Sequence, residues 1–377
     1  MNQIVLTPDQ VDELGRELDE LRARIVAQLG TEDREYLYKI IKTQRTLEVV
    51  GRGCFYLGFL PPFWLAGVAA LGVSKILDNM EIGHNVMHGQ YDWMREKELN
   101  SREFEWDTVC PADQWRHSHN YMHHTYTNVL DMDRDIGYGI LRMDRAQKWN
   151  PYYLGNPVWA FLLMVGFEWG VMLHELEAEN VVQGKRRWRD VKPLIKGWWR
   201  KAGRQVVKDY VVFPALTGPL FVTTLLGNAA ANLVRNVWAY SIIFCGHFPS
   251  GVQTFTAEET GLAEGSTHQE TRGEWYVRQM LGSANIEGGP LFHIMSGNLS
   301  HQIEHHLFPD LPAYRYPQMA PEVRALCEKY GLPYNSGGFF KQIGSVWQKI
   351  FSLALPNSLT RPDSVPGVIV LREIRAA

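Results

Sequence analysis

The order of hydrophobic and polar residues predicts a chain built from helices. Near the N-terminus, Thr7-Pro8-Asp9-Gln10 has the form of a capping box with proline at the first helical position. Apolar residues then recur at steps of three and four, namely Val11, Leu14, Leu18, Leu21, Ile25 and Leu29. We expect this amphipathic helix to pack on its own domain, with docking to a partner or a membrane surface as the alternative.

Two long apolar regions predict helices that cross a membrane. Residues 53–74 and 211–234 carry no charged side chain, and a span needs about 20 apolar residues. We therefore expect membrane spans near 47–80 and 210–246.

The positions of the turns in these regions decide how many spans there are. The first region is either one long span or a tight hairpin that turns near Pro61-Pro62. The second is long enough for two crossings if its turn falls at Gly227-Asn228. A shorter apolar stretch, 157–173, contains Glu168 and is expected to be an interfacial or cap helix rather than a span.

A basic segment gives the chain an orientation. Residues 185–208 contain ten Lys and Arg side chains, and the positive-inside rule places such a segment on the cytosolic side. A docking site for the phosphates of an acyl-CoA or for an acidic electron donor is the alternative.

Composition excludes several classes of protein. The net charge of -3 gives no basic excess for nucleic acid, and the charged residues of 7–45 exclude a signal peptide. The four cysteines lie far apart without a CxxC pair, so zinc ribbons, iron–sulfur clusters and disulfide frameworks are not expected. We divide the chain into an N-terminal helical segment (1–45), a membrane domain (46–325) and a C-terminal cytosolic segment (326–377).

Most of the thirteen histidines fall in three groups: His84 and His88; His117, His119, His123 and His124; and His301, His305 and His306. On a helix, residues four apart lie on one face with about 6 Å between them. The pairs with this spacing are His84/His88, His119/His123, His301/His305 and Gln302/His306. Each pair could therefore bind a metal ion from one helix face.

The number of imidazoles favours two iron ions. It exceeds the three or four ligands that one zinc ion takes in proteins, and nitrogen donors suit iron. A ferritin-like carboxylate site needs a pair of Glu-x-x-His motifs, whereas this chain has only Glu81-Ile-Gly-His84. No cluster, nucleotide-binding or haem motif is present in the sequence, so electrons must come from outside.

With these motifs, the sequence resembles the membrane fatty acid desaturase family, whose members carry three histidine boxes. Three segments of this chain are similar to those boxes: Gly83-His84-Asn-Val-Met-His88-Gly89, His119-Asn-Tyr-Met-His123-His124 and His301-Gln302-Ile-Glu-His305-His306. Within the family, the stretches 75–89 and 273–285 look like those of the actinobacterial NADPH-dependent stearoyl-CoA 9-desaturases.

The resemblance implies an all-α integral membrane protein with about four transmembrane helices and a large cytosolic cap that carries the boxes. It implies a bacterial inner (cytoplasmic) membrane location, two iron ions, O2 as co-substrate, and electrons from NADPH through a separate ferredoxin- or flavin-type reductase. The implied reaction is a cis double bond, Δ9, in stearoyl- or palmitoyl-CoA. An acyl-lipid or front-end (Δ6) desaturase and a related di-iron hydroxylase or ketolase are alternatives.

The resemblance also implies a set of metal ligands: His84, His88, His119, His123, His124, His305 and His306 from the boxes, and His247 from the end of the second apolar region. The family pattern selects Gln302 in box three, while His301 is a rival because of its spacing to His305. His117 is an extra histidine with a capping or outer role. His174, His268 and His293 are expected to be ordinary polar residues or partners of ligands.

Two further expectations concern the loop after box two and the class of protein. Asp131-Met-Asp133-Arg-Asp135 begins like a calcium loop but has Ile136 where such a loop needs glycine, so we expect a surface loop. A membrane metal carrier is the non-enzymatic rival, but a carrier would place histidines inside its spans, and here they lie beyond them.

Overall fold

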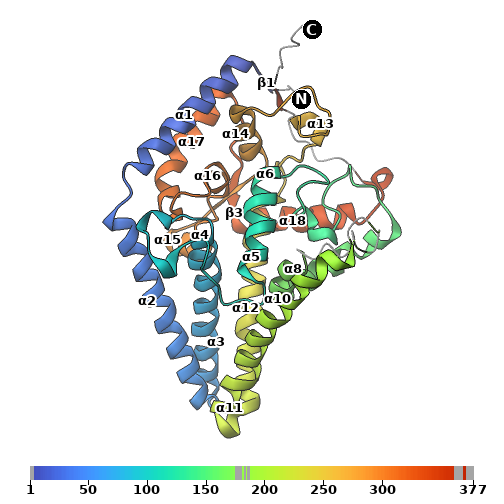
Figure 1. The fold of residues 1–377 in the computed structure, drawn as a ribbon. Helices are drawn as coiled ribbons and strands as arrows, with labels where there is room; N and C mark the ends of the chain where they lie inside the picture. Colours follow the sequence, from blue (N-terminus) through green and yellow to red (C-terminus); the bar gives the residue numbers. More distant parts are fainter. Residues whose placement is uncertain (1–3, 175–180, 182–183, 185–186, 361–367, 371–377) are drawn as a thin grey trace.

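The computed structural model describes residues 4–174, 181, 184, 187–360 and 368–370, and these residues form an all-α protein (Figure 1). Lys185 and Arg186 of the basic segment lie outside the described residues, as do 361–367 and 371–377 of the C-terminal segment. Four three-residue strands in the described part form two parallel pairs, β1 (Ile4–Leu6) with β4 (Val368–Val370) and β2 (Asn285–Glu287) with β3 (Ser336–Gly338).

The helices differ in length according to their place in the molecule. The longer ones are α1 (Pro8–Val26), α2 (Thr31–Cys54), α3 (Pro61–Ile76), α10 (Trp188–Val207), α12 (Phe221–His247), α17 (Tyr316–Tyr330) and α18 (Phe339–Leu353). The shorter ones are α4 (Asn85–Met87), α5 (Ala112–Trp115), α6 (His124–Tyr126), α7 (Asn156–Val165), α8 (Phe167–His174), α11 (Phe213–Leu216), α13 (Ala257–Thr260), α14 (Arg272–Leu281), α15 (Pro290–Met295) and α16 (Gln302–Leu307).

Four long helices, α2, α3, α10 and α12, converge into a cone with α11 at its tip (Figure 1). α2 packs on α3, and α3 packs on α12. Large apolar side chains on the outside of this bundle are more than half exposed, namely Phe59, Leu65, Leu216, Val222 and Leu226. An exposed apolar surface of this kind marks a region that contacts another apolar phase or partner.

A membrane span requires both length and apolar composition in one helix. Among the described residues, no helix alone is both long enough and apolar enough to cross a bilayer. One pair of helices, Pro151–Val165 and Phe167–His174, meets both requirements when taken together, but the pair is bent by 101° at the break between them.

The first apolar region forms the hairpin that was one of its two expected arrangements. α2 ends at Cys54, a short 3-10 turn covers Phe55–Leu57, and α3 starts at Pro61. Proline at the first helical position suits this start because its missing N–H would have no partner there.

The predicted turn of the second region at Gly227-Asn228 is wrong. The chain turns instead over α11 and a 3-10 segment, Gly218–Leu220, while Gly227 and Asn228 lie inside α12. A Cβ at Gly227 would lie 2.5 Å from the Phe55 ring, so glycine is there for close helix packing. Asn228 Nδ2 donates to the Asp209 carbonyl at 2.6 Å. The second apolar region therefore turns between two helices, α10 and α12, and α10 carries the basic segment.

Buried charges tie the bundle together. Lys75 Nζ lies 2.7 Å from Asp209 Oδ2 and 3.3 Å from Asp107 Oδ2, and Arg52 reaches Asp209 at 3.4 Å. Removing one partner from a buried ion pair typically costs about 3–5 kcal/mol. This network therefore fixes α2 and α3 relative to the segment that follows α10.

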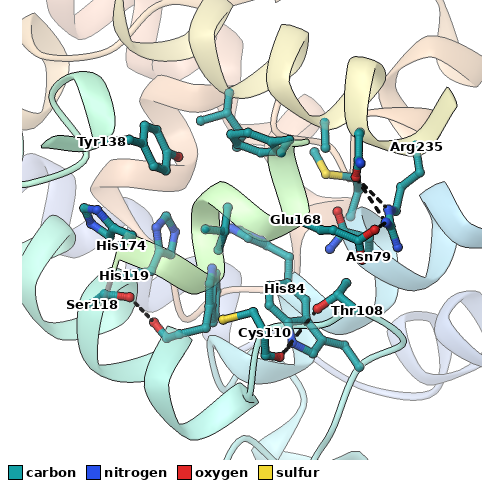
Figure 2. A pocket seen from close by; sticks show the side chains of 18 of the residues that line it. Asn79, His84, Thr108, Cys110, Ser118, His119, Tyr138, Glu168, His174 and Arg235 are labelled. Carbon is teal, nitrogen blue, oxygen red and sulfur yellow. Dashed lines mark hydrogen bonds and ion pairs between the residues drawn. The ribbon is translucent and has the colours of Figure 1, made fainter. Parts of the chain in front are cut away.

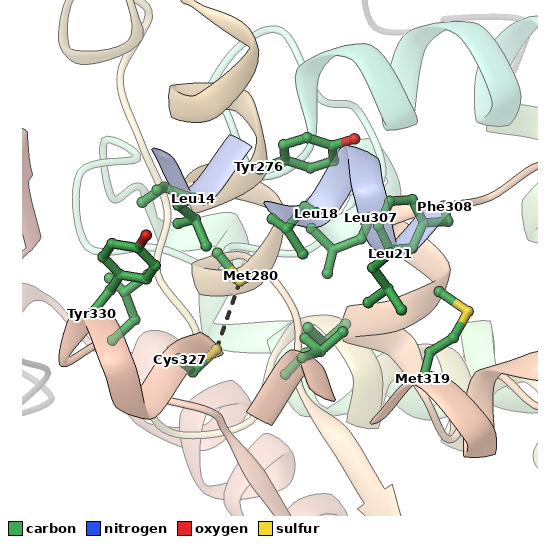
Figure 3. Packing of buried hydrophobic residues seen from close by; sticks show 14 of the residues in the cluster. Leu14, Leu18, Leu21, Tyr276, Met280, Leu307, Phe308, Met319, Cys327 and Tyr330 are labelled. Atoms are coloured by element: carbon green, nitrogen blue, oxygen red, sulfur yellow. Dashed lines mark hydrogen bonds between the residues drawn. The ribbon is translucent and has the colours of Figure 1, made fainter. Parts of the chain in front are cut away.

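The N-terminal helix packs on the cap, as expected. Thr7 Oγ1 accepts from the Gln10 N–H at 3.3 Å, and Gln10 Oε1 accepts from the Thr7 N–H at 2.9 Å, which confirms the capping box. The apolar stripe of α1, with Leu14, Leu18 and Leu21, lies against α14 and α17 (Figure 3). Each such side chain contributes about 1.5–3 kcal/mol when fully buried.

Candidate metal centre

The first two histidine boxes overlap π-helical turns. Box one begins inside a π-helix, Leu77–His84, which continues α3 directly into α4 and has His84 as its last residue. The first two histidines of box two lie on another π-helix, Arg116–His123. Such turns are rare and often occur at functional sites. His247 is the last residue of α12, and box three forms α16.

These elements bring seven imidazoles into two groups. Cluster one contains His84, His88, His119 and His305, and cluster two contains His123, His247 and His306. Within each cluster, the potential ligand atoms lie within 4.8 Å of one another. The ring of His124 lies between the clusters, 4.7 Å from that of His88 and 4.6 Å from that of His306.

Most of these imidazoles are held through Nδ1. His123 Nδ1 lies 3.0 Å from Asp133 Oδ2, His305 Nδ1 3.2 Å from Tyr316 Oη, and His306 Nδ1 3.0 Å from Gln279 Oε1. His119 Nδ1 lies 3.3 Å from Asp135. In this arrangement Nδ1–H donates to its partner, which fixes the tautomer and the ring orientation.

The opposite ring nitrogen is left without a partner. Among the described residues, Nε2 is buried and makes no hydrogen bond in His84, His88, His119, His123, His124 and His305. A buried polar group without a partner costs about 1–3 kcal/mol. Anchored Nδ1 atoms and converging free Nε2 atoms are the arrangement of histidines that bind a metal ion.

Burial also keeps most of the imidazoles neutral, as metal binding requires. It lowers the pKa of His84 to about 3. Burial, followed by the neighbouring imidazoles, holds the pKa of His124 and His306 well below the usual value. His123 differs: burial opposes its charged form, but Asp133 and Asp135 outweigh burial and raise its pKa to about 9.

The two candidate ligands of box three, Gln302 and His301, have different neighbours. Gln302 Nε2 lies 2.9 Å from His247 Nε2, so this side chain belongs to the surroundings of cluster two. His301 caps α16 with φ -101° and ψ 58°, and its ring lies 4.6 Å from that of His293. The helical pairing of His301 with His305 does not form, because the helix begins only at Gln302.

Other predicted residues lie away from the clusters. His117 is exposed, and its ring lies 6.1 Å from that of Tyr121. His268 pairs with Glu274 at 2.8 Å, and His293 Nδ1 lies 2.7 Å from Ser300 Oγ.

The expected surface loop at Asp131–Asp135 is wrong for two of its three carboxylates. Asp133 is 3% and Asp135 8% exposed, because they accept from ligand-type histidines. Asp135 Oδ1 also lies 2.9 Å from His174 Nε2. The Asp-x-Asp pattern ten residues after box two was a usable signal for these partners, whereas nothing in the sequence marked Tyr316 or Gln279.

A cavity with an empty volume of about 700 Å³, which includes its open mouth, lies beside cluster one. Its lining includes His84 and His119 and is otherwise largely apolar and aromatic, with Trp106, Trp115 and Phe167. Figure 2 shows His174 and Tyr138 near His119, and a buried Arg235–Glu168 ion pair on the opposite side. The cavity therefore presents apolar and aromatic side chains directly next to the histidines of cluster one.

This geometry defines an all-α protein with two buried histidine clusters of the kind that hold metal ions, beside a cavity. The sequence pattern of the fatty acid desaturase family matches residues 61–338, and the chain belongs to that family, whose members are O2-dependent oxidoreductases.

Curated relatives extend this similarity. The chain is 45% identical to the NADPH-dependent stearoyl-CoA 9-desaturase of Mycobacterium tuberculosis (strain CDC 1551 / Oshkosh) over 363 residues, covering 95% of this chain and 83% of the relative. It is 26% identical to the sn-1 linoleoyl-lipid 6-desaturase of Synechocystis sp. over 300 residues, covering 74% and 77%. It is 25% identical to fatty acid desaturase 3 of Bos taurus over 255 residues, covering 63% and 52%.

Proposed function

We propose that this protein is a membrane-bound di-iron desaturase that places a cis Δ9 double bond in a long-chain saturated acyl-CoA, with stearoyl- or palmitoyl-CoA as substrate. The observation that carries the proposal is the set of buried Nε2 atoms without partners. The 45% identity to a stearoyl-CoA 9-desaturase over nearly the whole chain supports the substrate class and bond position.

The metal ligands in this proposal are His84, His88, His119 and His305 for one iron ion, and His123, His247 and His306 for the other. His124 lies within reach of both clusters and serves as the eighth imidazole. Gln302 faces cluster two, so we assign it and not His301 to that site. Two iron ions bound there would supply O2 reduction and the removal of one hydrogen from each of two adjacent methylenes.

The rest of the site holds the substrate and excludes water. The cavity beside cluster one takes the acyl chain, and its rigid aromatic walls select one pair of carbons by position. Trp115 stacks on the His119 ring with centroids 4.5 Å apart, and it closes the cavity wall next to cluster one. Two electrons come from NADPH through a separate reductase, and two protons complete the formation of water from O2.

In this proposal the part of the cone formed by the uncharged segments 53–74 and 211–234 enters the bacterial inner membrane, with the cap and the metal centre on the cytosolic side. The exposed apolar surface of the bundle supports this placement. The orientation is supported by the Lys and Arg residues of α10, which precede the uncharged segment 211–234. The positive-inside rule places such flanking residues on the cytosolic side, and α10 extends from the wide end of the cone (Figure 1).

The test is to express the protein, feed saturated acyl chains and locate the new double bond by mass spectrometry, with iron measured on the purified protein. We expect Δ9 products that have lost two hydrogens and about two iron ions per chain. A product that gains oxygen would indicate the hydroxylase, and a Δ6 bond on a lipid-linked chain the front-end desaturase. Protein with full activity and no iron would contradict the ligand assignment.

A further inference from the structure

Helix α18 has three distinct faces. One is buried against the protein and contains Gln342, Val346 and Ile350. A second is apolar but exposed, with Phe340 86% and Phe351 58% exposed and Trp347 partly exposed between them. The third is polar and contains Lys341, Ser345 and Lys349. A helix with separate core, apolar and polar faces is typical of the boundary between lipid and water.

The polar face of α18 is turned toward the cap. Ser345 Oγ accepts from the Ser250 N–H at 3.1 Å, and Ser250 follows the cap end of α12. Residues 340, 347 and 351 lie on the other side of the helix, because each is offset from residue 345 by well over a quarter turn. The exposed apolar face is therefore turned away from the cap.

α18 begins beside the part of α12 just beyond Arg235, the single Lys, Arg, Asp or Glu residue of that helix. The Phe339 ring lies 6.0 Å from that of Trp238, four residues beyond the uncharged run 211–234. At the same level, Asn236 Nδ2 donates to the Val165 carbonyl of α7 at 2.9 Å. Both α7 and α18 thus meet α12 within three residues of Arg235.

α7 continues the apolar exposure of α18. The two helices pack on each other and on α12, and α7 leaves Val158 56%, Phe161 51% and Leu162 52% exposed. We call these three residues together with Phe340, Trp347 and Phe351 the interfacial surface. Exposed apolar patches of this size are rare in water-facing proteins and mark interaction surfaces.

We propose that the interfacial surface rests in the headgroup region of the bilayer and supports the cap beside the bundle. The proposal rests on the membrane placement of the bundle given above, but not on the metal chemistry. The occupant is lipid because the surface lies beside α12 and continues the exposed apolar exterior that Val222 and Leu226 give the bundle. The surface also holds one wall of the acyl cavity at the membrane, since α8 follows α7 directly and contributes Phe167 and Val171 to that wall.

The test uses single cysteines in a Cys54→Ala background, in which the three remaining cysteines are buried. Full-length Phe340→Cys, Phe351→Cys and Lys341→Cys proteins are placed one per lipid nanodisc and treated with a membrane-impermeant maleimide. We expect labelling of the two apolar positions to be at least tenfold slower than labelling of Lys341→Cys, the adjacent polar control. Equal rates at Phe340→Cys and Lys341→Cys would overturn the proposal.

Two further measurements distinguish lipid from a second copy of the chain and the interfacial surface from the bundle. Leu226→Cys reports on the bundle. If Leu226→Cys is shielded from the maleimide while Phe340→Cys reacts freely, only the proposal for the interfacial surface fails. If both react freely, the membrane placement of the bundle is refuted. A short bis-maleimide that joins Phe340→Cys proteins into dimers in detergent would instead identify a second copy as the occupant and overturn the proposal. Iron content measured on the same samples shows that each variant is folded.

Discussion

Cluster one and cluster two are built from similar residues but by different means. Cluster one takes four imidazoles from the three boxes, including the pair His84 and His88 from a single helical segment. Cluster two takes three imidazoles from three separate elements and is approached by the amide of Gln302. The short-range spacing of the sequence therefore builds part of cluster one, whereas cluster two exists only through tertiary packing.

The two clusters share one support. The loop after box two places Asp135 against His119 of cluster one and Asp133 against His123 of cluster two. A carboxylate that accepts from Nδ1–H raises the basicity of the ligand and fixes its ring. This loop therefore couples the orientation of one ligand in each cluster.

The largest expected effect comes from removing a ligand of cluster one. His305→Ala should abolish desaturation and weaken iron binding at cluster one by more than the roughly 10–100-fold in affinity that loss of an outer partner costs. The measurement is iron content with acyl product analysis, on protein that still inserts into membranes. Normal iron and full activity would show that cluster one is not a metal site.

The second effect separates a buried carboxylate of the loop, Asp133, from an exposed one, Asp131. Asp133→Asn removes the charged partner of His123 and should reduce iron affinity by about 10–100-fold. Asp131→Asn is the matched control, because Asp131 is exposed in the same loop. Competition with a chelator measures both variants; equal iron retention in the two would show that the loop does not support the ligands.

The third effect tests the box-three assignment. Gln302→Ala should lower iron occupancy to about one ion per chain, since it alters only cluster two. His301→Ala should retain both ions because its ring packs on His293. The reverse result, with iron lost only from His301→Ala, would restore the rival interpretation.

The sequence was sufficient where function depends on local spacing. The boxes and the α1 capping box followed from patterns within single segments, and the all-α class followed from the family resemblance that the boxes carry. The turn at Gly227-Asn228 was mispredicted because glycine and asparagine favour turns in general, whereas here they serve contacts with Phe55 and Asp209.

Box three and the Asp-x-Asp loop show the second limit of sequence reasoning. His301 has the right spacing to His305, but spacing places two residues on one face only when both belong to the helix. Asp133 and Asp135 were expected in a surface loop because Ile136 stands where a calcium loop needs glycine, but their partners, His123 and His119, lie in another segment. Tertiary contacts decided both cases, and a single sequence does not contain them.

The smallest expected effect concerns the backbone next to Gln302. A Cβ at Gly246 would lie 2.9 Å from Gln302 Cγ and 3.0 Å from its Cδ, so Gly246→Ala must displace this side chain. Overpacking of this kind costs about 1–3 kcal/mol, and we expect a several-fold loss of activity with cluster one unchanged. In the double variant Gly246→Ala/Gln302→Ala the side chain that the new Cβ would displace is absent. Gly246→Ala should therefore add little to the effect of Gln302→Ala. Additive losses would show that Gly246 acts on another part of cluster two, such as the neighbouring His247, rather than through Gln302.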